Sequence, residues 1–396
     1  MGYDVFCGLD VGKESHHGTA LNRDGDRVAD RVVANDETAL RELFDVLGGK
    51  GEVLVVVDQP SSIGSLPIAV ARSMGIDVAY LPGLSMRRLA DLHPGNAKTD
   101  ARDAFIIADA ARTLPHTLRQ VDLDDEQLAE LEVLVGHDDD LVGQSTAVSN
   151  RIRGLLLQIH PALERAIGEN ASHPGVLDVL ARFGGPTGMR VAGQVKIRNL
   201  LGKKAPRIGD RLAAQIWTAL GEQTVIIPGT VASEKVLTRL ANQLITLQGQ
   251  RTQVATEIQE ALDAHPLSSV LTSMPGVGVR TAARILVEIG DASTFPTAGH
   301  LAAYAGIAPV TRKSGTSIRG EFPSRSGNKN LKNAFFMSAF ASLRADPVSR
   351  AYYDRKRGEG KKHHAAIICL ARRRSDVLYA MLRDRRPYQQ PVSAAA

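Results

Sequence analysis

The chain has 396 residues, 43% of them hydrophobic and 23% charged, which is enough for two or three globular domains with substantial cores. The chain contains no run of about 18 apolar residues, so no transmembrane helix is predicted, and the N-terminus has no signal-peptide pattern. Two distant cysteines, Cys7 and Cys369, support neither a disulfide framework nor a cysteine zinc site. We therefore expect a soluble, cytoplasmic, multidomain protein.

The net charge of +5 is unevenly distributed along the chain. Residues 1–125 contain 13 Lys/Arg and 20 Asp/Glu, residues 126–262 contain 14 of each, and residues 263–396 contain 21 Lys/Arg and 9 Asp/Glu. An acidic segment can hold divalent cations and a basic segment can hold phosphate backbones, although both are also common as plain solvated surfaces. The asymmetry favours a nucleic-acid partner.

Residues 1–125 have the pattern of a ribonuclease-H-like α/β fold. Three β-favouring runs predict an antiparallel meander, and alternating helices and buried strands follow it. This is the element order of that fold. The predicted strands are 3–9, 17–21, 26–33, 52–57 and 78–81, and the predicted helices are 36–47, 63–74 and 100–112.

Heptad periodicity marks the middle of the chain. Apolar residues step by four and three over 141–159 and again over 237–258, where only Arg251 interrupts the series. These runs predict coiled-coil helices within 126–262 that pair with each other or with another subunit. The segment 174–228 between them is an insert to which the sequence assigns no role.

The last third predicts a compact basic domain of short helices. It covers 263–388, and its loops between residues 309 and 332 are rich in Gly, Ser and Lys. The final residues, 389–396, are expected to be frayed.

Four aspartates stand where the predicted fold brings them together. Asp10 ends the first strand and Asp58 ends the fourth, which is its parallel neighbour, while Asp100 and Asp103 share one face of a later helix. A single Asp at a strand end is more often a turn former, but four carboxylates in one place repel one another unless cations neutralise them. We therefore predict a Mg²⁺ (or Mn²⁺) site for phosphodiester chemistry, with phosphate-binding cations nearby at Lys98 and Arg102.

A nucleotide-hydrolysing enzyme is the competing interpretation of the N-terminus. The stretch LDVGKE at 9–14 also fits the first phosphate loop of actin-like ATPases and sugar kinases. The second phosphate loop and the adenosine motif of those proteins are not recognisable, and GEGKK at 358–362 lacks residues of a Walker loop. Nucleotide hydrolysis is therefore the poorer explanation.

The segment MPGVGVRT at 274–281 lies between two helical runs. A glycine turn entering a helix presents backbone N–H groups that can hold a phosphate, as in the helix-hairpin-helix of sequence-independent DNA binders. Such turns are also plain connectors, but the basic surroundings favour nucleic acid. The candidate binding residues here are Gly276, Gly278 and Arg280.

Ser314 lies in the basic stretch TRKSGTSIRG. Neighbouring cations would favour its alkoxide and stabilise a pentavalent phosphorus transition state, although a serine in a flexible loop explains the same residues and, from the residues alone, explains them better. Tyr352 and Tyr353 are less suitable as nucleophiles because the Arg-His set of tyrosine recombinases is not recognisable. The candidate phosphate-binding residues around Ser314 are Arg312, Lys313, Arg319 and Lys329.

Taken together, the motifs resemble the DEDD-type insertion-sequence transposases, which are related to the Piv DNA invertases and act as bridge-RNA-guided recombinases. The matching segments, in the order of that family, are GLDVGKE, VVVDQP, NAKTDARDA, MPGVG, LAAYAGIAPVTRKSGTSIRG with GNKNL, and YYDRKRGEGK. The resemblance implies a RuvC-like N-terminal domain, a coiled-coil connector and a C-terminal transposase domain.

Further expectations rest on this resemblance alone. It implies that Asp10, Asp58, Asp100 and Asp103 hold Mg²⁺, with Asp58 standing where the family commonly has Glu. It implies a nucleophile at Ser314, with Ser317, Ser324 and Ser326 as rivals, and a covalent 5′-phosphoserine intermediate. The implied partners are the DNA of the element ends and the target, a non-coding guide RNA from the element and further copies of the chain as a dimer of dimers, with the protein associated with the bacterial nucleoid and no membrane involved.

Two other functions remain open. A RuvC-like, structure-specific endonuclease would use the carboxylates alone, with water as the nucleophile. A non-catalytic nucleic-acid-binding protein would need neither the carboxylates nor Ser314.

Overall fold

The computed structural model describes residues 2–59, 62–93, 99–120, 126–314 and 318–390, and gives only the backbone for several of these, including 312–314, 318 and 319. The chain divides into two compact units, Met1–Asp125 and Glu126–Ala396. In the described residues, no helix is long and apolar enough to cross a membrane.

The N-terminal unit is built on one six-stranded sheet of order β3-β2-β1-β4-β5-β6. The first three strands are antiparallel, β4 and β5 run parallel to β1, and β6 is antiparallel to β5. This confirms the predicted ribonuclease-H-like order and adds a short edge strand. The strands are β1 (Val5–Asp10), β2 (Ser15–Asn22), β3 (Arg27–Ala34), β4 (Val53–Val57), β5 (Asp77–Tyr80) and β6 (Arg119–Gln120).

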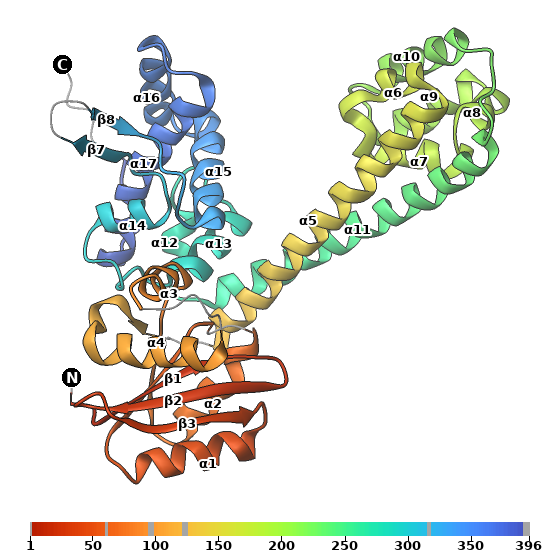
Figure 1. The fold of residues 1–396 in the computed structure, drawn as a ribbon. Coiled ribbons are helices and arrows are strands. Elements are labelled where there is room, and N and C mark those ends of the chain that lie inside the picture. The colour runs from red at the N-terminus through yellow and green to blue at the C-terminus, as the bar shows by residue number, and fades with distance from the viewer. Residues whose placement is uncertain (1, 60–61, 94–98, 121–125, 315–317, 391–396) are drawn as a thin grey trace, which may run out of the picture. The chain divides into compact units, whose positions relative to one another are not determined.

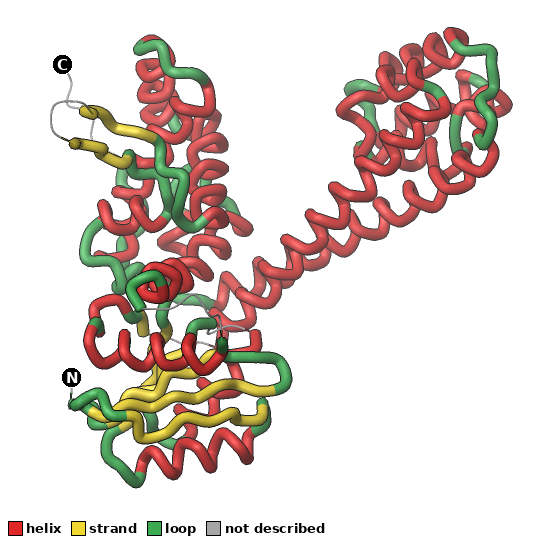
Figure 2. Tube along the Cα trace, in the orientation of Figure 1, coloured by secondary structure: helices red, strands yellow, loops and turns green. Residues whose placement is uncertain are grey.

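Helices cover both faces of this sheet (Figure 2). Because side chains alternate along a strand, Cys7 and Val55 face α1 and α2, whereas Phe6 and Val56 face α4. The strands are therefore apolar on both sides, as their sequence predicted. The helices are α1 (Glu37–Gly48), α2 (Ser65–Ser73), α3 (Gly83–Ala90), which the sequence analysis missed, and α4 (Asp100–Thr113).

The second unit contains two long antiparallel helices, α5 (Glu126–Ile159) and α11 (Thr230–Ala264), that pack along each other (Figure 1). The predicted apolar positions of α11 are all buried, and those of α5 are buried except Ser145 and Leu155, which are half-buried; Leu156 is buried instead of Leu155. The two periodic segments thus pair with each other within one chain.

The insert between these helices is itself helical and begins earlier than the expected residue 174. Its core is formed by residues such as Leu177, Ile197 and Ile216, and three of its helices begin with proline, which suits the first helical turn. The helices are α6 (Pro161–Ile167), α7 (Pro174–Phe183), α8 (Pro186–Ala192), α9 (Gln194–Lys204) and α10 (Gly209–Glu222).

The C-terminal residues share one continuous core with α5 and α11, so 126–262 and 263–388 belong to a single compact unit. The expected short helices are present, but a two-stranded antiparallel ladder, β7–β8, occupies the stretch expected to be loop. The expected frayed tail falls almost entirely on 391–396, outside the described residues. The elements are α12 (Ser268–Thr272), α13 (Val279–Ile289), α14 (Ala298–Tyr304), β7 (Val310–Ser314), β8 (Ile318–Phe322), α15 (Lys329–Ala345), α16 (Pro347–Gly358) and α17 (His363–Asp384).

Candidate functional site

Asp10 and Asp58 meet at one edge of the N-terminal sheet. Strands β1 and β4 are parallel neighbours, and Leu9 pairs in register with Val57. The next residue of each chain segment is therefore an aspartate at the carboxyl end of its strand. Both carboxyl groups are half-buried because the strands that carry them lie in the middle of the sheet.

Helix α4 brings two further carboxylates to this edge. Its N-terminus is capped by the side chain of Thr99, and Asp100 and Asp103 occupy its first turn. The helix packs directly on β1 because Gly8 has no side chain; a Cβ atom there would lie 2.3 Å from the carbonyl oxygen of Ala104. The close approach of backbone to backbone thus places the first turn of α4 beside the end of β1.

The other three carboxylates act electrostatically on Asp10. The pKa of Asp10 is raised to about 7, first by burial and then by the negative charges of Asp58, Asp100 and Asp103. Burial also raises the pKa of Asp58, whose Oδ1 atom is buried without a hydrogen-bond partner in the described structure. Hydrogen bonds from the Val11 backbone and the Gln59 side chain act in the opposite direction on the pKa of Asp58, but a buried carboxylate oxygen without a donor, such as its Oδ1, is costly.

The donor set suits a hard divalent cation. Four carboxylates supply oxygen ligands and negative charge of the kind that Mg²⁺ and Mn²⁺ prefer, and the orphaned oxygen of Asp58 is a free ligand atom. Among the described residues, no three acidic, histidine or cysteine side chains already stand in a metal-holding arrangement.

Of the two phosphate-binding cations predicted beside the four aspartates, the structure describes only Arg102. Lys98 lies outside the described residues. The Arg102 guanidinium donates to the backbone carbonyls of Ala90 and His93, at 3.2 and 3.0 Å, at the end of α3. In this structure Arg102 ties α3 to α4.

In the second unit, the turn between α12 and α13 uses its two glycines differently. Gly276 has a φ of +84°, and a Cβ atom on it would lie 2.6 Å from the Ser338 carbonyl oxygen, so this part of the turn packs against α15. A Cβ atom on Gly278 would meet nothing within 4 Å, and no side chain caps the start of α13. Only the Gly278 side of the turn presents open backbone.

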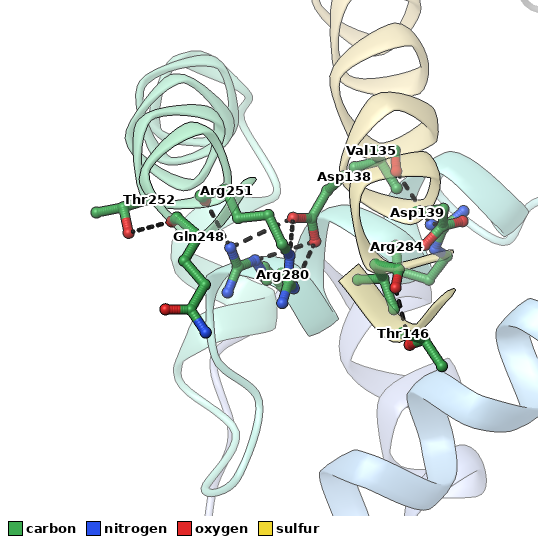
Figure 3. Close-up of polar contacts among 10 residues, drawn as sticks. Val135, Asp138, Asp139, Thr146, Gln248, Arg251, Thr252, Arg280 and Arg284 are labelled. Carbon is green, nitrogen blue, oxygen red and sulfur yellow. Dashed lines mark hydrogen bonds and ion pairs between the residues drawn. The ribbon is translucent and has the colours of Figure 1, made fainter. Parts of the chain in front are cut away.

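Arg280 is held in an ion-pair network (Figure 3). Asp138 of α5 lies between Arg251 of α11, at 3.0 Å, and Arg280 of α13, at 3.2 Å. One helical turn along α13, Arg284 pairs with Asp139. These contacts join α13 to the base of the two long helices, and they give Arg280 a structural partner that the sequence analysis did not anticipate.

For Ser314 and its predicted phosphate-binding neighbours Arg312, Lys313 and Arg319, the structure gives the backbone but not the side chains. Ser314 ends β7 and is paired with Ile318, and Lys313 is paired with Arg319. Of the rival serines, Ser317 lies outside the described residues. Ser324 and Ser326, together with Lys329, lie in the described segment after β8. There the Ser324 hydroxyl donates to the Ser326 carbonyl.

Sequence reasoning missed Asn328, which organises this segment. Its side chain caps α15 and donates to Glu288 and to the Tyr304 hydroxyl, while its backbone N–H donates to the Tyr304 carbonyl. The available signal was an Asn immediately before a helical run, which is an N-cap pattern.

A buried arginine was also missed. Arg374 is 4% exposed, and its pKa is lowered to about 10 by burial. It donates to the Ser338 hydroxyl and to the Pro275 carbonyl, so it joins α17 to α15 and to the glycine turn. The run of three arginines at 372–374 gave no indication that only the third is internal.

Known proteins match both units. Residues 7–161 match the DEDD-type transposase family model of IS110 elements, and residues 268–354 match the transposase model of the IS116/IS110/IS902 family. The chain is 56% identical to an insertion element IS110 protein of Streptomyces coelicolor over 98% of this chain and 96% of the relative. It is 36% identical to an insertion element IS900 protein of Mycobacterium paratuberculosis over the full length of both. It is 35% identical to the pilin gene-inverting protein of Moraxella bovis over 36% of this chain and 46% of that protein.

Proposed function

Because the chain belongs to the IS110 family of insertion-element transposases, we propose that it cuts and exchanges DNA strands with a serine nucleophile and a divalent metal held by Asp10, Asp58, Asp100 and Asp103. The family itself establishes a DNA-cleaving transposase with a DEDD domain. The serine, the metal ligands and the guide RNA are the proposed parts.

The observation that carries the proposal is the uncompensated charge at the sheet edge. Asp10 has a pKa raised to about 7, and Asp58 has a buried oxygen without a donor. A protein that needed these groups only for stability would pair them, as this chain pairs Asp138 with two arginines. When bound, a divalent cation would neutralise the carboxylates and stabilise negative charge on the reacting phosphate.

The covalent step is assigned to Ser314. Its hydroxyl oxygen attacks the phosphorus of the scissile phosphodiester and gives up its proton. The bond from phosphorus to the 3′ oxygen breaks, and that oxygen takes a proton to become a 3′ hydroxyl. The product is a 5′-phosphoserine, which a 3′ hydroxyl of the exchanged strand can attack in turn. The cations of β7 and β8 would hold the phosphate oxygens.

The partners follow from the same proposal. The DNA is the pair of element ends and the target, and an element-encoded guide RNA selects both by pairing. Further copies of the chain would complete a dimer of dimers. Of the predicted nucleic-acid-binding residues whose burial the structure describes, Gly278, Arg280 and Lys329 are exposed.

A covalent-trapping experiment tests the mechanism. Full-length protein, Mg²⁺, DNA of the element end and the flanking non-coding RNA are mixed and separated on a denaturing gel. We expect a protein–DNA adduct that is lost in Ser314→Ala and in Asp10→Ala and kept in the matched control Ser324→Ala. An adduct kept in Ser314→Ala would assign the nucleophile elsewhere.

Two further outcomes separate the alternatives. Cut DNA with no adduct in any lane would mean a water-using, RuvC-like nuclease. Cutting that is equal with and without the RNA would remove the guide from the proposal while leaving the serine and metal in place.

A further inference from the structure

Five rings gather where three C-terminal helices pack together. Phe336 and Phe340 lie four residues apart on α15, Tyr353 comes from α16, and His363 and His364 begin α17. Helices α15, α16 and α17 lie side by side in this part of the second unit (Figure 1). We refer to these five rings as the aromatic face.

The rings of the aromatic face hold one another in fixed orientations. Phe336 is stacked on His364 with centroids 4.8 Å apart, and Phe340 meets His363 edge-on at 6.2 Å. The Tyr353 hydroxyl lies 2.7 Å from Nδ1 of His363. Because the orientations are already set, a flat ligand would bind with little loss of side-chain freedom.

The aromatic face lies at the margin of the core: Phe336 and Tyr353 are half-buried against it, and the other three rings are exposed. Phe340 is 44% exposed and its neighbour Met337 is 46% exposed, whereas Phe335 on the same helix is 1% exposed. His363 and His364 are also exposed. A ring cluster that served only packing would bury its surface as Phe335 does.

The surroundings of the aromatic face are positively charged. Residues 354–362 contain five Lys or Arg and two Asp or Glu. Lys361 and Lys362 are exposed directly before His363, and no side chain caps the N-terminus of the 22-residue helix α17. Exposed lysines and the first backbone amides of a long helix favour an anionic group such as a phosphate.

We propose that the aromatic face binds unpaired bases of a DNA strand, with a neighbouring backbone phosphate at Lys361, Lys362 and the start of α17. Exposed rings beside cations are what sequence-independent binding of single strands requires, because every base has a stacking face and every nucleotide a phosphate. DNA is the occupant because the family acts on DNA, and cutting and exchanging strands leaves bases without their partners. The inference depends neither on Ser314 nor on a guide RNA.

The test measures binding of the full-length protein to a single-stranded DNA of about 12 nucleotides that carries 2-aminopurine. We expect the 2-aminopurine fluorescence to be quenched on binding, as it is when the base stacks. Phe340→Ala should weaken binding by about 5- to 100-fold and abolish the quenching, while Phe340→Trp keeps both. Binding of a fully paired duplex should be the same in all three proteins.

Two control variants separate stacking from other causes. Met337→Ala removes a similarly exposed apolar side chain without a ring and should keep the affinity of the wild type. Lys362→Gln should make the slope of log affinity against log salt concentration shallower by about one phosphate contact. The fluorescence quenching should be retained. His364→Ala gives a second test of the rings if Phe340→Ala folds poorly.

Several outcomes would overturn the proposal. Wild-type affinity in Phe340→Ala, or an equal loss in Met337→Ala, would exclude stacking. Ring-dependent binding that is tighter for RNA of the same sequence would assign the face to RNA instead of DNA. If the wild-type protein bound the strand without quenching the 2-aminopurine fluorescence, the bases would not stack on the aromatic face, and the face would be assigned to a protein partner.

Discussion

Two groups of partly buried carboxylates in this chain differ in how their negative charge is neutralised. In the N-terminal unit, Asp10 and Asp58 face other carboxylates, and one oxygen of Asp58 has no donor in the described structure. In the second unit, Asp138 is 8% exposed and is bridged by two arginines. The residue type and the degree of burial are similar, but the compensation of charge differs.

The difference separates a carboxylate whose charge is neutralised within the chain from carboxylates whose charges are not. Asp138 joins three helices, and its negative charge is satisfied within the chain (Figure 3). The N-terminal carboxylates lower the stability of the unit that holds them, because their like charges repel and burial disfavours ionisation. This is the charge balance that the proposed divalent cation would complete.

The largest effect is expected from Asp58→Asn, which keeps the shape of the side chain and removes its charge. We expect DNA cutting in Mg²⁺ to fall by about a thousandfold or more, the scale of losing a metal ligand worth several kcal/mol. The melting temperature should stay the same or rise, because the orphaned charge is gone. A nicking assay on element-end DNA and a thermal melt of the same preparation measure both.

Asp109→Asn is the matched control in the same unit. Asp109 lies on α4 and pairs with Arg112 at 2.8 Å, so its carboxylate is already compensated. Its loss should keep cutting within a few-fold of the wild type. Equal loss of activity in the two variants would contradict the division into paired and unpaired carboxylates.

The next largest effect is expected from Asp138→Asn, which should reverse the pattern. Leaving Arg251 and Arg280 without their shared carboxylate is expected to destabilise the junction of α5, α11 and α13 by about 1–3 kcal/mol. Hydrogen exchange of peptides from these helices should quicken, while the N-terminal unit exchanges as in the wild type. Asp140→Asn, an exposed neighbour on α5, should change stability by less than about 0.5 kcal/mol; the idea fails if both variants exchange alike.

The comparison also shows why the sequence predicted one carboxylate group and missed the other. Asp10 and Asp58 end β-favouring runs, and the order of strands and helices was enough to bring them together. Asp138 lies among three consecutive aspartates on a helix, which read as a solvated face. The available signal was Arg251, the charged residue in an otherwise apolar series, because a cation in a helical seam needs a carboxylate opposite it.

The helices and strands that were predicted correctly are likewise those with a strong local sequence pattern. Strands β1 to β5 are apolar, β-favouring runs and were predicted close to their bounds, and the heptad runs 141–159 and 237–258 lie within the longer helices α5 and α11. Helix α3 and strand β6 were missed because both are short: the former has eight residues, including Gly, Ser and two Arg, and the latter has two. Strands β7 and β8 were missed because Gly, Ser and Lys dominate the stretch that contains them.

The smallest and most specific effect is a pH-dependent difference in melting temperature between the wild type and Asp10→Asn. The pKa of Asp10 is raised from 3.8 to about 7 in the folded chain, so the stability it contributes is fully present below pH 3.8 and is lost as the pH rises through about 7. Below pH 3.8 the two proteins should therefore melt within about a degree of each other, because Asp10 then holds its proton in both the folded and the unfolded chain, and the difference should grow as the pH rises toward 7. At pH 8 the variant should melt a few degrees higher.

Magnesium should remove that difference from one side only. At pH 8 the ionised carboxylates of the wild type gain a cation, and its melting temperature should rise toward that of the variant, whereas Asp10→Asn, with a ligand and a charge fewer, should respond weakly. A magnesium response of equal size in both proteins would mean that the ion binds elsewhere, and a variant that is less stable than the wild type at pH 8 would mean that Asp10 has a partner in solution. Either result would place Asp10 with Asp138 among the carboxylates that serve the fold.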